Sequence, residues 1–192
     1  MILRPEQLRP PKSLAKKNNM PDKDKPLINR VAKSGLITFV LEGLAPKNPI
    51  VIFDIKDYLW QGLVLREKDF RLALKEHDWT SYNDKTVCIM CSVDAIVPTW
   101  AYMLIASHVQ PHATRVFQGS PDAFLTIWFE KEIENLDIEK FTDAMVVIKG
   151  CGGKNVPDSA YVTLVSRLQP HVRSLMFGEP CSTVPLYKRP RN

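Results

Sequence analysis

The sequence lacks a long apolar run. No window approaches the stretch of about eighteen uncharged apolar residues that a membrane-spanning helix requires. Its first residues, MILRPEQLRPPKSLAKKNNM, place prolines and charges where a signal peptide needs an apolar segment. These absences predict a cytoplasmic protein with no membrane partner.

Signatures of common enzyme classes are also missing. No Gly-x-Ser-x-Gly elbow of a serine hydrolase occurs. The segment GCGGKN at 150–155 has neither the first glycine nor the Ser or Thr of a phosphate-binding P-loop. Cysteine is scarce, with four residues, and in a cytoplasmic protein such thiols stay reduced and are free to pack, bind a metal or react. The sequence leaves open whether the chain is an enzyme.

The net charge of +5 is carried by the two ends of the chain. Residues 1–26 contain seven Lys or Arg against three Asp or Glu, and the last five residues contain three more cations, which leaves a net charge of −2 on residues 27–187. A basic groove within the fold is therefore not expected, and nucleic acid is an unexpected partner. We interpret 1–26 as a disordered basic leader, 27–187 as a single α/β domain and 188–192 as a basic tail.

The apolar pattern predicts alternating strands and helices. The segments GLITFVLEGL and IVIFDI are expected to form an antiparallel hairpin. The strands TVCIMCS, TRVFQG, AMVVIKG and RSLMFG then alternate with helices of about a dozen residues. This order is typical of βαβ units and predicts an α/β fold with a mostly parallel sheet covered by helices on both faces.

Two segments, 98–121 and 157–180, resemble each other. They begin PTWAYMLIASHVQPH and PDSAYVTLVSRLQPH, and nine of their 24 positions are identical when Pro98 is aligned with Pro157 without a gap. Ordinary composition would give about one or two identities. We interpret the segments as a duplicated β-loop-α-β unit, although convergence on a common βαβ pattern is the alternative.

Three cysteines follow three of the predicted strands: Cys91, Cys151 and Cys181. The carboxyl ends of parallel strands line the ligand crevice of such sheets, so we expect the three thiols to converge at one edge. Thiolates are good ligands for Zn or Fe, and three of them need a fourth ligand. The candidates for this ligand, or for its pocket, are Asp54, Asp94 and Glu179. Cys88 points to the opposite face of its strand from Cys91, and we interpret it as a core residue.

Other residues near this edge are expected to line a pocket: Gly150, Gly152, Tyr102 and Tyr161. Two further interpretations of the cysteines stay open. The helices that begin near Pro98 and Pro157 direct their positive amino ends at the cysteine loops, which favours a thiol-dependent enzyme or a sulfur carrier. Alternatively, the cysteines only pack, and the chain is a non-catalytic binding or scaffold protein with a protein partner or a homo-oligomeric state.

Several strings resemble one known family. FDIKDYLWQGLVLREKDFR, CSVDAIVPTWAYML, IKGC, VPDSAY and MFGEPCSTVPLYK are similar to the bacterial proteins grouped as domain of unknown function 2480, from about Asn29 to Lys188. The resemblance implies no activity, because the family is uncharacterised. Some members are encoded near iron–sulfur cluster assembly components, which implies a role in support of iron–sulfur metabolism. The basic leader before Leu27 departs from the family pattern.

Overall fold

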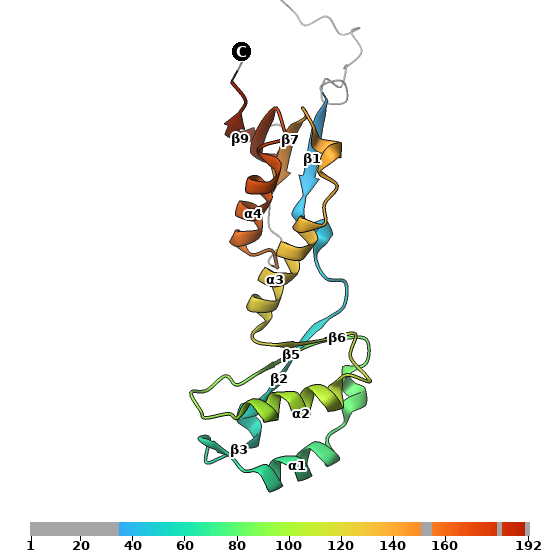
Figure 1. Cartoon of the computed structure of the whole chain (residues 1–192), viewed down its shortest axis with the longest axis vertical. Coiled ribbons are helices and arrows are strands. Elements are labelled where there is room, and N and C mark those ends of the chain that lie inside the picture. Colours follow the sequence, from blue (N-terminus) through green and yellow to red (C-terminus); the bar gives the residue numbers. More distant parts are fainter. Residues whose placement is uncertain (1–34, 151–154, 180–181, 191–192) are drawn as a thin grey trace, which may run out of the picture.

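Two separate sheets organise the chain (Figure 1). The computed structural model describes residues 35–150, 155–179 and 182–190. Within them, one sheet has the strand order β2-β5-β6 and the other has the order β1-β7-β8-β9; we call these the first and the second sheet. They occupy opposite ends of an elongated molecule, and helix α3 runs from one end towards the other (Figure 1). The predicted leader, 1–26, lies outside the described residues.

The first sheet is parallel throughout. Its strands are β2 (Ile50–Asp54), β5 (Thr86–Met90) and β6 (Arg115–Gln118). Helices α1 (Glu67–Glu76) and α2 (Thr99–Val109) share one hydrophobic cluster with Val87 and Ile89 of β5. A short antiparallel ribbon, β3 (Leu59–Trp60) and β4 (Val64–Leu65), follows β2. The carboxyl end of this sheet therefore lies next to the ribbon and the loop that leads into α2.

The second sheet joins the beginning of the described chain to its end. Its strands are β1 (Leu36–Val40), β7 (Met145–Lys149), β8 (Ser174–Glu179) and β9 (Ser182–Lys188). The first three are parallel, and β9 is antiparallel to β8. Helices α3 (Pro121–Glu134) and α4 (Asp158–Leu168) share a core with Val146, Ile148 and Leu175 of this sheet.

Helices α2, α3 and α4 and strands β1, β2, β5, β6, β7 and β8 form where the sequence predicts them, whereas β3, β4 and β9 were not predicted. Helix α3 begins after Ser120, whose Oγ accepts a hydrogen bond from the backbone N–H of Ala123 at 3.2 Å, and Pro121 occupies its first turn. Cys88 is 0% exposed and belongs to the cluster that contains Phe124 and Phe129 of α3. This burial confirms the interpretation of Cys88 as a core residue.

The predicted antiparallel hairpin is wrong. Strand β1 pairs with β7, and β2 pairs with β5, because residues 41–49 carry the chain from one sheet to the other. The prediction of a single sheet is wrong for the same reason, whereas the α/β class and the mostly parallel pairing of its strands are confirmed. A single domain over 27–187 stays a prediction, as does the covering of both sheet faces by helices. No helix among the described residues is long and apolar enough to cross a membrane.

The backbone of the two βαβ units recurs in the register of the sequence similarity. Units β5–α2–β6 and β7–α4–β8 have helices that begin at Thr99 and Asp158, which are aligned with each other in that comparison. Thr86 pairs with Arg115, and their aligned counterparts, Met145 and Ser174, pair in the same way. One alignment therefore relates the two backbones as well as the two sequences, while their origin in a duplication stays a prediction.

Substitution of Gly178 should destabilise the fold. Gly178 has φ +118°, and a Cβ added there would lie 2.7 Å from the backbone oxygen of Ser182 in β9. We expect Gly178→Ala to lower the free energy of unfolding by about 1–3 kcal/mol, measured by urea denaturation. Gly43→Ala is the control, because a Cβ at Gly43 meets nothing within 4 Å. Equal effects of the two substitutions would contradict this prediction.

Candidate functional site

Asp54 fixes the loop that contains Cys91 at the carboxyl end of the first sheet. Its Oδ1 accepts hydrogen bonds from the backbone N–H groups of Ser92 at 3.0 Å and Lys56 at 3.1 Å. Burial raises the pKa of this carboxyl, but the hydrogen bonds from Ser92 and Lys56 outweigh that effect and hold the pKa below its ordinary value of 3.8. Cys91 is half-buried beside this contact, and its Sγ–H donates to the carbonyl oxygen of Val93 at 3.4 Å.

Asp94 lies in the same loop but does not share this arrangement, because its side chain is exposed. The structure therefore distinguishes the two predicted acidic residues near Cys91. Asp54 already binds backbone amides and the Lys56 ammonium, whose Nζ lies 3.4 Å from Oδ2. Through these contacts Asp54 holds the loop that contains Cys91 in place.

An open cleft lies between α2 and the edge strand β6; we call it the Tyr102 cleft. Its volume is about 570 Å³, and the residues that border it include Tyr102, Met103, Ala106, Gln110, Val116 and Gln118. Burial raises the pKa of the Tyr102 hydroxyl, and the proximity of the Cys91 thiolate charge raises it further. Tyr102 and Cys91 both pack against the hydrophobic cluster that contains Ile89 of β5 and Ile105 of α2, so they lie on the same side of the first sheet.

A second cleft occupies the corresponding place in the second sheet; we call it the Tyr161 cleft. Its volume is about 430 Å³, and α4 contributes Tyr161, Val162 and Val165. In the alignment of the two units, these positions match Tyr102, Met103 and Ala106. The difference lies in β9, whose Leu186 borders the Tyr161 cleft. Each predicted tyrosine therefore lines a cleft, and a β9 residue borders only the Tyr161 cleft.

The carboxyl ends of β7 and β8 lie next to each other in the second sheet. Lys149 Nζ and Glu179 Oε2 are 2.9 Å apart. Gly150 permits a close approach here, because a Cβ at this position would lie 2.1 Å from the ring of Phe177. The remaining predicted residues near these strand ends lie outside the described residues: Cys151, Gly152 and Cys181.

The expectation that all three cysteines follow strands of one sheet is wrong. Cys91 follows β5 of the first sheet, whereas β7 and β8, which precede Cys151 and Cys181, belong to the second. The strand pattern could not show this, because it does not tell which strands share a sheet. Among the described residues, no group of three His, Cys, Asp or Glu side chains could hold a metal ion. The three-cysteine site itself stays a prediction.

The sequence analysis missed a cluster around His77, whose ring packs against Phe53 of β2 in the first sheet with the ring centroids 5.4 Å apart. His77 Nδ1 lies 3.1 Å from the hydroxyl of Tyr58, and Nε2 lies 3.2 Å from the hydroxyl of Tyr82. A neutral imidazole can donate through one nitrogen and accept through the other, so it serves both hydroxyls. Burial lowers the pKa of His77 and raises the pKa of both tyrosines. The sequence signal that could have indicated this cluster was the aromatic string HDWTSY at 77–82.

Comparison with known families identifies the chain. The family described as "Protein of unknown function (DUF2480)" matches residues 25–189, which is most of the sequence. The chain belongs to the DUF2480 family. This membership confirms the resemblance carried by strings such as EPCSTVP. No curated protein and no solved structure matches the chain significantly. The DUF2480 description assigns no activity, so the function of the site has to be argued from its residues.

Removal of the Asp54 carboxylate should destabilise this DUF2480 chain at neutral pH. We expect Asp54→Ala to cost about 1–2 kcal/mol in unfolding free energy, because two backbone N–H groups lose their acceptor. Since the pKa of Asp54 is lowered in the folded state, this contribution is present above pH 3.8 and is lost as the pH falls through the folded-state pKa. Asp94→Ala, at an exposed position, should change stability by less than about 0.5 kcal/mol. A similar loss in both variants would refute the anchoring role.

His77 should make stability decrease in mildly acidic solution. Its folded-state pKa is lower than the ordinary 6.5, so the unfolded chain binds a proton more readily and stability falls as the pH drops from 6.5 towards the folded-state pKa. We expect His77→Gln to weaken this dependence in urea denaturation measured across that range. His171→Gln, at an exposed position, should retain the wild-type dependence. A His77→Gln profile parallel to that of wild type would contradict this assignment.

Proposed function

We propose that the protein binds a transition metal, Zn or Fe, through cysteine thiolates at strand ends, with Cys151 and Cys181 as the central pair. The observation that supports this proposal is the Lys149–Glu179 ion pair of 2.9 Å between neighbouring strands. Each cysteine follows one of these two residues by two positions. Each of the two adjacent strand ends is therefore followed by a cysteine two positions later in the sequence.

Cys91 is the third thiolate in this proposal, although its strand belongs to the first sheet. A cavity of about 510 Å³ lies between the halves, on the α3 side of the first sheet, and Cys91 does not border it. Asn155, which follows the Cys151 segment, borders this cavity together with Pro121 and Asp122 of α3. Helix α3 begins directly after β6, and the N–H of Gly119 donates to the carbonyl oxygen of Ile89 in β5 at 2.9 Å. Asn155 therefore lies near the beginning of α3, which directly follows the first sheet.

The chemistry of the three side chains selects the class of ion. Soft thiolates bind Zn and Fe in preference to Mg or Ca, which require oxygen ligands. Three thiolates leave one position of a tetrahedral site for a fourth ligand. Among the acidic candidates, Glu179 is the one closest to the Cys151–Cys181 pair along the sequence, two residues before Cys181. Together with the resemblance to proteins encoded near cluster-assembly components, this set favours support of iron–sulfur metabolism.

A second candidate function is thiol chemistry at Cys91. It is favoured by this half-buried thiol, which packs against the same hydrophobic cluster as Tyr102 of the Tyr102 cleft, where a substrate of the enzyme or a sulfur carrier's partner could bind. This function requires one cysteine to react much faster than the others. Alkylation of the folded protein at graded pH, with mass-spectrometric assignment of the modified thiol, distinguishes it from metal binding.

Total metal analysis tests the first proposal. Protein purified without a metal-affinity step should contain about one Zn or Fe per chain, and Cys151→Ser or Cys181→Ser should remove it. Cys88→Ala is the matched control, because Cys88 is buried in the core away from the strand ends, and this variant should retain the metal. Retention of metal by Cys91→Ser would limit the site to the central pair. A folded, metal-free wild type would reject the proposal.

A further inference from the structure

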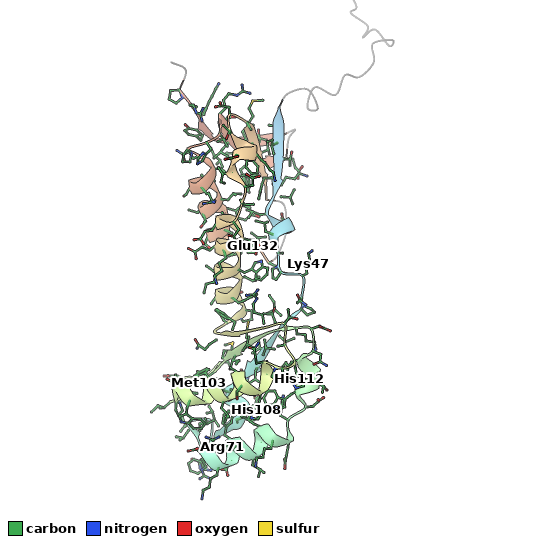
Figure 2. All side chains as sticks on the ribbon, turned by 45° about the vertical axis from the view of Figure 1, so that its right-hand side comes forward. Lys47, Arg71, Met103, His108, His112 and Glu132 are labelled. Carbon is green, nitrogen blue, oxygen red and sulfur yellow. The ribbon has the colours of Figure 1, made fainter. Side chains whose placement is uncertain are left out.

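Glu42 carries a buried carboxylate oxygen without a hydrogen-bond partner. The atom is Oε2, and it meets no donor in the part of the chain that the structure describes, although the residue as a whole is only half-buried. Lys47 supplies the one positive charge of the connection 41–49, but it is exposed at the outside of that connection (Figure 2). Removal of a carboxylate oxygen from water is costly unless a donor or a cation meets it. The Oε2 atom of Glu42 therefore indicates a missing partner of positive charge.

The position of Glu42 relates it to the strand ends of the proposed metal site. Val40, the last residue of β1, pairs with Lys149, the last residue of the neighbouring strand β7 (Figure 1). Glu42 follows Val40 by two positions, as Cys151 follows Lys149 by two positions. Paired strands lie about 4.8 Å apart. The chain that carries Glu42 therefore leaves the second sheet at the same edge as the chain that leads to Cys151, one strand away from it.

The turn that carries Glu42 is held in place on both sides. Glu42 belongs to a short 3₁₀ helix, η1 (Leu41–Leu44), which directly follows β1. Leu41 is 0% exposed and packs in the core of the second sheet. The carbonyl oxygen of Leu44 accepts a hydrogen bond from the indole N–H of Trp128 at 2.7 Å. A side chain that a fixed turn presents is a preorganised ligand.

The other acidic side chains near the strand ends are engaged or exposed. Glu179 Oε2 lies 2.9 Å from Lys149 Nζ. Asp54 already accepts hydrogen bonds from two backbone N–H groups, and Asp94 is exposed. Of these four acidic residues, Glu42 is the one with a buried oxygen that no donor occupies.

We propose that Glu42 is the carboxylate ligand of the metal ion at Cys151 and Cys181. Because this assignment depends on the proposed metal site, it gives Glu42 the position that the thiolates leave. Carboxylate oxygen and thiolate sulfur are both accepted ligands of Zn and Fe. Each of these three ligands then follows the last residue of one of three neighbouring strands, β1, β7 and β8, by two positions. The bound cation would supply the partner that Oε2 lacks.

Titration of the metal-free full chain with Zn, in competition with a chromophoric chelator, tests this assignment. We expect Glu42→Gln to raise the Kd for Zn roughly tenfold or more, because changes to residues that merely support a ligand already cost about 10–100-fold. Glu179→Gln is the matched control. It removes the partner of Lys149 but no proposed ligand, so it should bind Zn as tightly as wild type.

Two further measurements distinguish a ligand from a residue that only supports the fold. In the metal-free chain, Glu42→Gln should raise the midpoint of urea unfolding, because it removes a buried charge that has no partner. With Co²⁺ bound in place of Zn, Glu42→Gln should keep the sulfur-to-metal charge-transfer bands of the cysteines and change the ligand-field bands. Cys151→Ser should instead weaken the charge-transfer bands.

The outcomes separate this assignment from the proposed function. Wild-type affinity for Zn in Glu42→Gln would overturn the assignment and leave the cysteine site intact. An equal loss of affinity in Glu179→Gln would also overturn it, because the effect would then come from the charge of the strand ends. Destabilisation of the metal-free chain by Glu42→Gln would overturn it as well, since the carboxylate would then have a structural partner. A wild type that binds no Zn or Fe rejects the metal site itself, and the assignment with it.

Discussion

The parallel pairing of β1 with β7 is the interaction on which the rest of the architecture depends. It joins Leu36, near the beginning of the described chain, to Met145, and the first sheet is built from the chain between these two residues. The connection 41–49 therefore leads away from β1 instead of turning back on it. This pairing also separates the strand before Cys91 from the strands before Cys151 and Cys181.

Helix α3 couples the two halves by packing. Its Phe124 and Phe129 share one core with Cys88 of the first sheet and with Val146 and Ile148 of the second. The Trp128 indole N–H also donates to the carbonyl oxygen of Leu44, in the connection between the sheets, at 2.7 Å. The two halves thus share one close-packed hydrophobic core, and the relative position of the two sheets depends on this helix.

The two clefts lie at matching positions of the two similar units of the chain. Tyr102 and Tyr161 occupy matching places, but β9 accompanies only the second cleft within the described structure. One unit has thus completed its sheet with its own chain, whereas among the described residues no strand lies on the other side of β6.

The sequence by itself determined the family, the α/β class, the helices α2, α3 and α4, and the burial of Cys88. Periodicity, the Ser120 cap and runs of apolar residues act over a few neighbouring positions, and these signals are visible in the letters. Only the tertiary structure decided that β1 and β2 belong to different sheets and that His77 lies between Tyr58 and Tyr82. Those outcomes depend on contacts between distant segments. Two apolar strands with similar patterns can each pair with β5 or with β7, so the pattern alone does not assign a strand to a sheet.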